Sequence, residues 1–357
     1  MMKILETGYT VPQSGVLGTS LGISRYTYYM AYYFRKFGHD VELFIRNDYK
    51  PDEVWIKTVT APKSNWIAYP FFLSNIIKNL NADVYFADYP STGLPFVWNK
   101  KSPSVVTIHD VIPLENDPNK MKPKNRIINK WYRYCFDQIK NADALIVRSN
   151  TEKKNALNFL PEEKIKVVFG GVDLKVYKPT KRKENKKLRI GYIGGLDGRK
   201  NSELLVKAFA ELSKDRNDIE LHVAGGGKNL ERFKAMNIPN AKFYGFIPED
   251  NTVSFLNSLD IFVYPTLREG LGLAPIEAMA CGLPVIVCNA TTMPEVVGKS
   301  GMIVDTNIES MKVGIGKMVD SKRLRLTYRS RGLKRAKALT WESAAKQAIK
   351  ILEGVRK

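Results

Sequence analysis

Cysteine, histidine and long apolar runs are scarce in this chain of 357 residues, and each scarcity excludes a class of protein. The three cysteines, Cys135, Cys281 and Cys288, have neither metal-binding nor redox-motif spacing, so buried free thiols in a reducing compartment are expected. The three histidines are too few and too scattered for a histidine-based metal site. No apolar run has membrane-spanning length, and the first residues lack a signal-peptide pattern. A cytoplasmic protein is therefore expected.

Basic residues are in excess. The chain contains 56 Lys and Arg against 36 Asp and Glu, a formal net charge of +20. The excess recurs in residues 120–140, 181–189 and 317–337. Nucleic acid, anionic lipid and phosphorylated substrates are all compatible with such a charge. The length and the hydrophobic content of 44% suit two domains, each with its own core.

Short apolar runs alternate with helical stretches along the whole chain. The strands expected in the first half are 3–7, 41–45, 54–59, 84–87, 105–108, 144–147 and 165–169. Those of the second half are 188–193, 219–224, 242–244, 261–264, 285–288 and 301–304. The longer helices expected are 23–37, 66–80, 126–140, 310–319, 322–338 and 341–355. This alternation predicts two parallel, doubly wound sheets with ligands at the carboxyl ends of their strands, joined near the polar segment 180–187.

The most informative stretch runs from Phe262 to Cys288 and reads FVYPTLREGLGLAPIEAMACGLPVIVC. Between two short strands it places a glycine loop and then a helix whose first turn suits Pro275. Free backbone amides and a helix N-terminus attract anions, phosphates above all. Glu269 and Glu277 flank this loop, where a carboxylate suits sugar hydroxyls better than the anion itself. Taken alone, Glu277 equally fits a first-turn helix glutamate favoured by the helix dipole.

A second candidate anion site follows the strand 188–193. Residues 194–201 read GGLDGRKN, so Arg199 and Lys200 stand beside a glycine turn, directly before a helix with Asn201 as its expected cap. Two cations at a helix N-terminus, which is already electropositive, need either an anion or bulk water. An anion site is the favoured interpretation, and a solvated basic turn is the alternative.

The pattern E-G-x-G-L-x-x-x-E, followed by A-x-A-x-G-x-P-V-I, resembles the donor-binding signature of retaining glycosyltransferases of the GT-B fold, specifically the family 4-like, group 1 enzymes. The resemblance implies an α/β fold of two doubly wound Rossmann-like domains that face each other across a cleft. Residues 1–178 would bind the acceptor, and residues 188–340 the nucleotide-sugar donor. The last helix, 341–357, would cross back to the first domain. The resemblance is strongest from 188 to 305.

The resemblance also assigns roles to single residues. Glu277 would hold the ribose hydroxyls, and Glu269 would face the donor sugar. Arg199 and Lys200 would bind the donor diphosphate. His109, directly after the strand 105–108, would lie against the sugar near its reacting carbon, and with Arg199, Lys200 and Glu269 it makes up the expected catalytic set. The other donor-binding positions implied are Gly22, Gly195, Phe246, Ile247, Gly270, Leu271, Gly272 and Leu273.

The implied reaction is transfer of a hexosyl group, with retention, from a UDP-, GDP- or ADP-sugar to an acceptor hydroxyl. The acceptor would be a glycan, a lipid-linked precursor or a polysaccharide precursor. The Asp-x-Asp motif that holds a metal and a diphosphate in the other large glycosyltransferase fold does not occur in this sequence. No metal and no other cofactor are therefore expected, because Arg199 and Lys200 can neutralise the diphosphate.

The basic region 120–133 suggests one further partner. The helix 126–140 is expected to turn one apolar side to the sheet and its basic face outward; the residues on the apolar side are Ile127, Ile128, Trp131, Cys135 and Ile139. An ordinary solvated surface helix is one interpretation. Contact with an anionic surface on the inner face of the membrane is the other.

Two functions of other classes stay open. A nicotinamide-dependent oxidoreductase or a sugar-nucleotide epimerase could use the same type of sheet, although the Gly194–Gly198 turn lacks the G-x-G-x-x-G spacing. A nucleic-acid-binding protein is suggested by net charge alone. The charge is spread over both halves without an aromatic-studded groove motif, so no nucleic-acid partner is expected.

Overall fold

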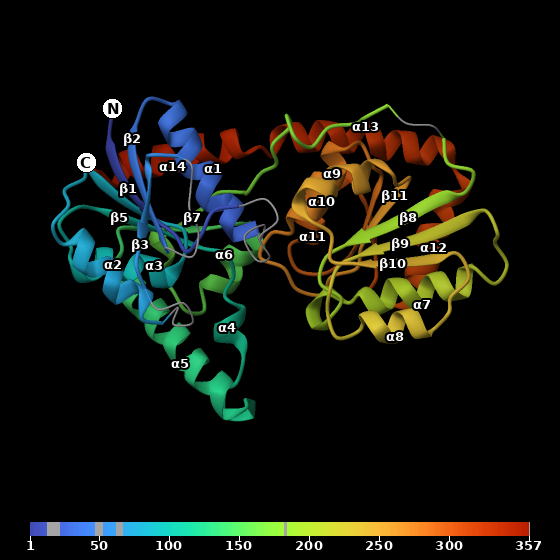
Figure 1. Cartoon of the computed structure of the whole chain (residues 1–357), viewed down its shortest axis with the longest axis horizontal. Helices are drawn as coiled ribbons and strands as arrows, with labels where there is room; N and C mark the ends of the chain where they lie inside the picture. Colours follow the sequence, from blue (N-terminus) through green and yellow to red (C-terminus); the bar gives the residue numbers. More distant parts are fainter. Residues whose placement is uncertain (13–21, 47–52, 62–66, 182–183, 357) are drawn as a thin grey trace. The chain divides into compact units, whose positions relative to one another are not determined.

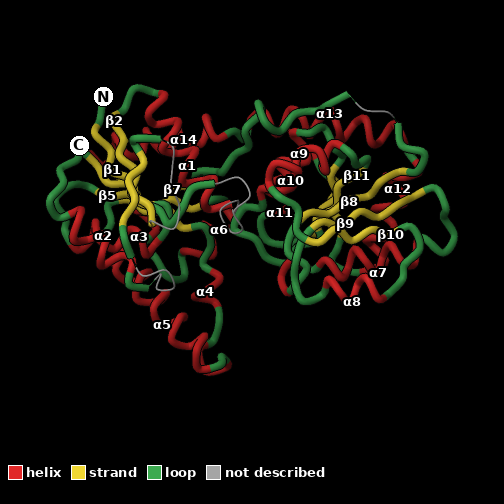
Figure 2. Tube along the Cα trace, viewed as in Figure 1, coloured by secondary structure: helices red, strands yellow, loops and turns green. Residues whose placement is uncertain are grey.

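The computed structural model describes residues 1–12, 22–46, 53–61, 67–181 and 184–356. These form two compact units. The first contains Met1–Gly170 and Trp341–Lys357, and the second contains Gly171–Thr340. Within each unit the strands form one sheet, and helices cover both of its faces (Figure 1, Figure 2). The α/β class and the doubly wound architecture predicted from the alternating pattern are confirmed.

The first unit is built on seven described strands in the order β3-β2-β1-β4-β5-β6-β7, paired in parallel throughout. Its strands are β1 (Lys3–Thr7), β2 (Asp40–Arg46), β3 (Ile56–Val59), β4 (Val84–Ala87), β5 (Ser104–Ile108), β6 (Ala144–Val147) and β7 (Ile165–Val167). Its helices are α1 (Gly22–Lys36), α2 (Tyr69–Ile77), α3 (Pro90–Trp98), α4 (Ile112–Glu115), α5 (Pro123–Gln138), α6 (Asn150–Ala156) and α14 (Trp341–Arg356).

Both faces of this sheet are covered, as β4 illustrates. All four of its residues are buried. Tyr85 stacks on Phe96 of α3 with ring centroids 4.5 Å apart, whereas its neighbour Phe86 packs edge-on against Phe34 of α1 at 5.3 Å. Successive side chains of a strand point to opposite faces, so both faces of β4 need an apolar cover. This explains why the strand is a continuous apolar run.

The C-terminal helix α14 completes the core of the first unit. Trp341, its first residue, is buried and stacks on Tyr29 of α1 with centroids 5.4 Å apart and planes 9° from parallel. It also contacts Tyr26 edge-on at 6.2 Å. A fully buried large side chain contributes roughly 1.5–3 kcal/mol to folding. The last helix is therefore an integral part of the first unit, although 170 residues of the second unit precede it in the chain.

The second unit has six described strands in the order β10-β9-β8-β11-β12-β13, again paired in parallel. Its strands are β8 (Leu188–Ile193), β9 (Ile219–Ala224), β10 (Ala241–Gly245), β11 (Ile261–Tyr264), β12 (Val285–Cys288) and β13 (Met302–Val304). Its helices are α7 (Ser202–Leu212), α8 (Leu230–Ala235), α9 (Glu249–Asn257), α10 (Leu273–Ala280), α11 (Met293–Val297), α12 (Ile308–Asp320) and α13 (Lys322–Ala338).

Part of the basic excess has a structural role in helix α13. Arg325 donates to the carbonyls of Met318 and Val319 at the end of α12, at 2.6 and 2.7 Å. Arg335 donates to the carbonyls of Glu295 and Val296 at the end of α11, at 2.8 and 2.9 Å. The last carbonyls of a helix have no partner within the helix, and they carry its negative dipole end. These arginines therefore cap neighbouring helices.

The boundary between the units lies earlier than the sequence predicts. Residues 171–178 were assigned to the first domain, but they belong to the second unit. The amide of Val172 donates to the carbonyl of Leu339 at 3.0 Å, and the Asn257 side chain donates to the carbonyl of Lys178 at 3.1 Å. Since these bonds attach the segment to the second unit, the division falls at Gly170–Gly171 and not near 178–187.

Several elements differ from the predicted ones. Helix α3 was not predicted, because Pro90 and Pro95 suggest a turn; Pro90 instead occupies the first turn of the helix, where a proline costs no hydrogen bond. The polar stretch 116–125 contains a short 3-10 helix, Pro118–Lys120, and the start of α5. Among the described helices, none is long and apolar enough to cross a membrane.

Candidate active site

The carboxyl ends of β8 and β11 meet at the point where the strand order of the second unit reverses. The two strands are neighbours, with Ile190 beside Ile261, although 67 residues separate them in sequence. From β8 the chain proceeds to β9 on one side, and from β11 it proceeds to β12 on the other. Ligands of doubly wound sheets bind at such a reversal, outside the carboxyl ends of the strands.

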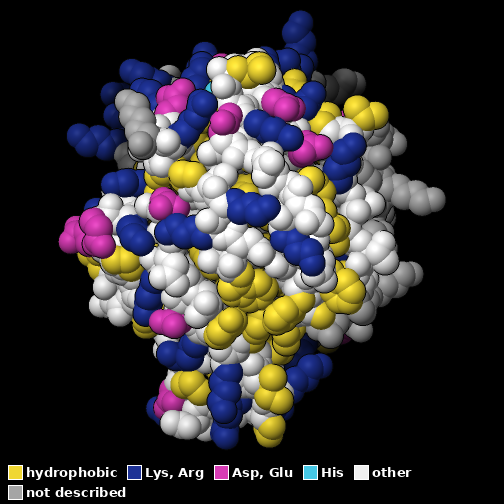
Figure 3. Space-filling view, turned by 90° about the vertical axis from the view of Figure 1, so that its left-hand side faces the viewer, with side chains coloured by type: hydrophobic (Ala, Val, Ile, Leu, Met, Phe, Trp, Pro, Cys, Tyr) yellow, Lys and Arg dark blue, Asp and Glu magenta, His cyan; other side chains and the backbone are white. Residues whose placement is uncertain are grey.

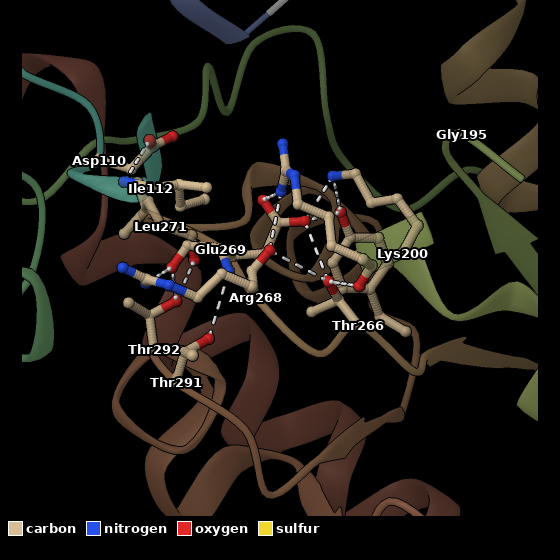
Figure 4. A network of polar contacts seen from close by, with 12 residues as sticks. Asp110, Ile112, Gly195, Lys200, Thr266, Arg268, Glu269, Leu271, Thr291 and Thr292 are labelled. Carbon is tan, nitrogen blue, oxygen red and sulfur yellow. Dashed lines mark hydrogen bonds and ion pairs between the residues drawn. The ribbon is translucent and has the colours of Figure 1, made fainter. Parts of the chain in front are cut away.

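The loops that follow these two strands join Arg199, Lys200 and Glu269 in one ion cluster. The Lys200 ammonium lies 2.5 Å from Oε1 of Glu269, and Nη1 of Arg199 lies 3.1 Å from Oε2. Each cation also donates to a second group: Lys200 to the Tyr264 hydroxyl at 2.8 Å, and Arg199 to the Arg268 carbonyl at 2.8 Å. Figure 4 shows Lys200 directed toward Glu269. The structure thus brings together three of the four predicted catalytic residues.

Glu269 is the buried centre of this cluster. Its side chain is 9% exposed, compared with 23% for Lys200 and 44% for Arg199. Burial alone would raise the pKa of Glu269, but the positive charges of Lys200 and Arg199 outweigh it, and the pKa lies below its usual value. Glu269 is therefore a carboxylate at neutral pH. Two cations around one anion leave the cluster with a net positive charge.

Three threonines, which were not predicted as site residues, form hydrogen bonds with the side chain and backbone of Glu269. Thr266 donates its hydroxyl to the Glu269 carboxylate at 3.1 Å. The hydroxyl of Thr291 accepts from the Glu269 amide at 3.2 Å, and Thr292 donates to the Glu269 carbonyl at 3.2 Å (Figure 4). Thr291 and Thr292 follow β12, the next strand of the sheet. A threonine pair after a strand carries no distinctive sequence signal, so only the sheet order reveals the role.

The glycines after β8 and β9 let two backbones touch. Gly225 has φ +143°, and a Cβ built on it would lie 1.7 Å from the carbonyl oxygen of Gly194. Any side chain at 225 would therefore displace the loop that leads to Arg199 and Lys200. Gly195 differs, because the nearest atom to its built Cβ is Cγ of Lys200 at 3.8 Å. Gly195 therefore lies beside Lys200, and its predicted contact with the donor stays a prediction.

The loop of Gly270, Leu271, Gly272 and Leu273 ends at the N-terminus of α10. Gly272 precedes the helix with φ +82°, a left-handed conformation that favours glycine. Leu271 is buried, and its carbonyl accepts from the Thr292 hydroxyl at 3.3 Å. Gly270 is buried and Leu273 is half-buried. Backbone amides at a helix N-terminus attract anions, and the predicted contact of this loop with the donor stays a prediction.

Glu277 is nearly buried, 4% exposed, and is the fifth residue of α10. The alternative interpretation as a first-turn glutamate is wrong, because α10 begins at Leu273 and its first turn contains no acidic residue. A buried carboxylate in the second turn gains little from the helix dipole, which acts on the terminal turn. Its assignment to the ribose hydroxyls stays a prediction.

Phe246 and Ile247 follow β10, the edge strand of the sheet. Phe246 is 51% exposed and Ile247 is half-buried. The preceding residue, Gly245, accepts from the Gly225 amide at 2.7 Å, which ties this segment to the glycine turn after β9. The predicted donor-binding role of Phe246 and Ile247 stays a prediction.

His109 belongs to the first unit, where both of its ring nitrogens are engaged. Nδ1 accepts from Nη1 of Arg148 at 2.9 Å, so the ring proton is on Nε2, which donates to the Asp88 carbonyl at 2.8 Å. Burial and the Arg148 charge hold the pKa of His109 well below its usual range, and the imidazole is neutral. Arg148 itself is buried over the Tyr26 ring at 4.2 Å. The predicted sugar contact of His109 stays a prediction and would use the ring edge or the backbone.

Two further sequence expectations concern residues at the starts of α1 and α7. Gly22 is the first residue of α1 and is half-buried. The preceding glycines, Gly15 and Gly18, lie outside the described residues. Asn201 does precede α7, with φ +50°, but its side chain makes no capping hydrogen bond, so the predicted side-chain cap is wrong.

Among the described residues, no group of three or more His, Cys, Asp or Glu side chains is placed to hold a metal.

Sequence profiles of two family modules match consecutive parts of the chain, from residue 21 to residue 335. The first, Glycosyltransferase Family 4, matches residues 21–176, and the second, Glycosyl transferases group 1, matches residues 175–335. The chain belongs to the group 1, family 4-like glycosyltransferases. The family resemblance predicted from the donor-binding signature is thereby confirmed. The second module contains Arg199, Lys200, Glu269 and Glu277.

Curated relatives are similar over part of their length. The O-antigen chain mannosyltransferase B of Escherichia coli is 30% identical over 44% of this glycosyltransferase chain and 44% of its own. The D-inositol 3-phosphate glycosyltransferase of Corynebacterium jeikeium is 28% identical over 70% of this chain and 66% of its own. The chain thus spans less than two thirds of the length of these relatives.

Solved structures match over nearly the whole chain and show the GT-B fold. The sucrose-phosphate synthase of Thermosynechococcus elongatus has a TM-score of 0.81 at 18% identity, and 99% of each chain is covered. Anabaena Alr3699/HepE, solved in complex with UDP-glucose, has a TM-score of 0.75 at 16% identity and covers 99% of this chain and 100% of its own. The GT-B fold predicted from the signature is therefore confirmed.

Proposed function

We propose that this protein transfers a hexosyl group from a nucleoside-diphosphate sugar to an acceptor hydroxyl, with retention of the anomeric configuration and without a metal. The observation that carries the proposal is the ion cluster of Arg199, Lys200 and Glu269 at the strand-order reversal between β8 and β11. It has a net positive charge beside a helix N-terminus, which suits a diphosphate. A related fold solved with UDP-glucose, Anabaena Alr3699/HepE, supports a nucleotide-sugar donor.

The cations and the carboxylate of the cluster would have different roles in the reaction. When the bond from the sugar C1 to the diphosphate oxygen breaks, negative charge accumulates on the leaving group. Arg199, Lys200 and the amides before α10 would stabilise that charge, since they are fixed before the reaction begins. Glu269 would hold the two cations in place and accept hydrogen bonds from the sugar hydroxyls. Glu277 would anchor the ribose.

A donor panel tests the proposal directly. The protein is incubated with UDP-, GDP- and ADP-linked hexoses and a panel of glycan and lipid-linked acceptors, and products are identified by mass spectrometry. The anomeric configuration of the new bond is then read by NMR. A product with inverted configuration, or binding of NAD in preference to every nucleotide sugar, would overturn the proposal.

Metal independence has its own test. The Arg199 and Lys200 cations would neutralise the diphosphate in place of a divalent ion, so turnover in excess EDTA should equal turnover without it. Loss of turnover in EDTA that Mg²⁺ or Mn²⁺ restores would show that a metal takes part and would overturn this half of the proposal.

The acceptor side of the proposal concerns the first unit. The acceptor would be a glycan, a lipid-linked precursor or a polysaccharide precursor, and the protein would work at the inner face of the membrane. The basic region 120–133 would supply the contact, because lysines near an anionic bilayer each add about 1 kcal/mol of binding free energy.

A further inference from the structure

Helix α5 has a second apolar stripe that faces solvent. The sequence predicted that Ile127 and Trp131 pack on the sheet together with Cys135 and Ile139. Cys135 and Ile139 are buried, but Ile127 is 65% exposed, so this part of the prediction is wrong. Ile127, Trp131 and Tyr134 follow at the spacing i, i+4 and i+7, which places them along one side of the helix. Tyr134 is 42% exposed.

Helices α2 and α3 extend this stripe into a wider surface. On α2, Phe71 is 51% exposed and Phe72 is 41% exposed. The Phe71 ring lies 5.1 Å from the Trp98 ring of α3 and 6.2 Å from the Trp131 ring of α5. We call this surface the aromatic face; its members are Phe71, Phe72, Ile76, Trp98, Ile127, Trp131 and Tyr134. In the view of Figure 3, hydrophobic side chains gather in a continuous group with Lys and Arg side chains around it.

Exposed lysines lie in or beside the same three helices. They are Lys78 after α2, Lys100 and Lys101 after α3, and Lys120, Lys122, Lys124 and Lys130 in and before α5. The nearby arginines are used inside the unit: Arg133 donates to the Leu114 carbonyl at 2.9 Å, and Arg126 donates to the Pro118 carbonyl at 3.1 Å. Within α5 the acidic residue Asp137 stands against four basic ones. The charge that faces outward is therefore mainly that of the lysines.

We propose that the aromatic face docks on an anionic lipid bilayer, with its apolar side chains at the level of the acyl-chain boundary and the surrounding lysines on headgroup phosphates. Aromatic rings beside cations are the composition that lies in a membrane interface, because each ring has an apolar body and each lysine can reach the phosphates. The proposal deepens the proposed function by placing the acceptor at a bilayer, but binding to lipid is measured without turnover.

A second copy of the chain is the other occupant that an apolar face could have. A two-fold interface would set the same lysines of both copies against each other, and a chain of net charge +20 repels its own copy.

Positive charge alone does not identify the aromatic face as the docking surface. Helix α13 has eight basic and no acidic residues among seventeen, but among its large apolar side chains only Leu326 is exposed beyond a third. Helix α13 therefore supplies matched controls.

Vesicle co-sedimentation tests the proposal. Vesicles of phosphatidylcholine with phosphatidylglycerol are compared with phosphatidylcholine alone, at low and high salt. The wild-type protein should bind the anionic vesicles and lose binding with salt. The double variant Phe71→Ser/Ile127→Ser should bind roughly tenfold or more weakly, since two exposed apolar side chains that would enter the bilayer are lost. The matched control Val313→Ser/Leu326→Ser, with side chains 45% and 56% exposed in the second unit, should bind like the wild type.

The lysines are tested in the same way. Changing Lys120, Lys122, Lys124 and Lys130 to Gln should weaken binding about tenfold or more at low salt. Changing Lys317, Lys322, Lys334 and Lys337 to Gln removes the same charge from the second unit and should leave binding nearly intact. Equal losses in both sets would mean that net charge alone attracts the protein, and this would overturn the assignment to the aromatic face.

Tryptophan fluorescence gives a measurement on the wild-type protein that needs no destabilising change. Lipids brominated in the acyl chain should quench the emission, and Trp131→Phe should remove much of that quenching.

Light scattering must show the same mass for wild type and Phe71→Ser/Ile127→Ser. If the wild type is a dimer and this variant is a monomer, the aromatic face is the interface with a second copy. That result would contradict the proposal of bilayer docking. Donor binding, measured by calorimetry with UDP-, GDP- and ADP-sugars, should be unchanged in every variant, so a failed donor panel and a failed lipid assay are separate results.

Discussion

The ammonium group of Lys200 lies 2.5 Å from Oε1 of Glu269, although the two residues are 69 positions apart in the sequence. The family resemblance implies separate roles for them, diphosphate binding for Lys200 and sugar binding for Glu269. Their contact shows that they belong to one ion cluster with Arg199, in which the buried Glu269 carboxylate holds both cations in place. A phosphate that approaches this cluster meets cations that are already positioned.

The cations should therefore act mainly on the chemical step. Arg199→Ala and Lys200→Ala should each lower kcat by about 10²–10³, as loss of one oxyanion-type donor does, because negative charge on the leaving group rises in the transition state. Steady-state kinetics with saturating acceptor measures this. Near-wild-type kcat in both folded variants would show that the diphosphate is bound elsewhere.

The same two variants should differ in stability. Arg199 is 44% exposed, and Arg199→Ala should scarcely move the Tm. Lys200 is 23% exposed and donates to the buried Glu269, so Lys200→Ala leaves that carboxylate with fewer donors and should cost roughly 1–3 kcal/mol. Thermal unfolding followed by circular dichroism measures both. Equal Tm values for the two variants would contradict the role of Lys200 as the inner partner.

Glu277→Ala should act mainly through the donor KM. The ribose is remote from the bond that breaks and changes little during the reaction, so contact with it stabilises the ground state and the transition state equally. The expected result is a raised donor KM with kcat close to that of the wild type. A loss in kcat as large as that of Arg199→Ala, in a protein with unchanged Tm, would place Glu277 at the reacting centre.

Two adjacent glycines give a matched test of the backbone contact after β8. In Gly225→Ala the new Cβ would meet the Gly194 carbonyl oxygen at 1.7 Å, at φ +143°. We expect a loss of roughly 1–3 kcal/mol in stability and weaker donor binding, because the loop that leads to Arg199 and Lys200 must move. Gly226→Ala has no atom within 4 Å of the new Cβ and should resemble the wild type. Calorimetric binding and Tm on both variants decide it.

The pH dependence of stability should reflect Asp88. Burial raises the pKa of this carboxyl to about 7, partly offset by hydrogen bonds from Thr27 and Thr92. A raised folded-state pKa means that the stability from the protonated group is present below the unfolded pKa and is lost as the pH rises through about 7. Asn mimics the protonated acid, since its amide can donate to Thr27 while its carbonyl accepts from Thr92.

Asp88→Asn should therefore gain in Tm over the wild type as the pH rises from about 5 to about 8, and the gap should be small at the acidic end. Asp137→Asn, whose parent side chain is 66% exposed, serves as the control and should show a flat difference. A gap between Asp88→Asn and the wild type that stays constant over this range would contradict the raised pKa. Differential scanning fluorimetry across the pH series measures it.

Most strands and the loop before α10 could be predicted because they depend on neighbours in the sequence. The four apolar residues of β11 are followed by a proline and a threonine, which end the strand. Gly270 and Gly272 predict a loop, and Pro275 predicts the start of a helix. Helix α3 was missed for the same reason, since prolines are local signals and Pro95 lies inside a helix that tertiary packing stabilises.

The sequence by itself determined the class of fold, the family signature and the residue types at the candidate site, since these follow from local spacing. Only the tertiary structure decided which of them meet. The pairing of Lys200 with Glu269 depends on β8 lying beside β11, and the engagement of His109 by Arg148 depends on β5 lying beside β6. Helical periodicity showed that α5 has apolar residues on one side, but not what covers them. Burial depends on the neighbouring helices, and these leave Ile127 and Tyr134 exposed to solvent.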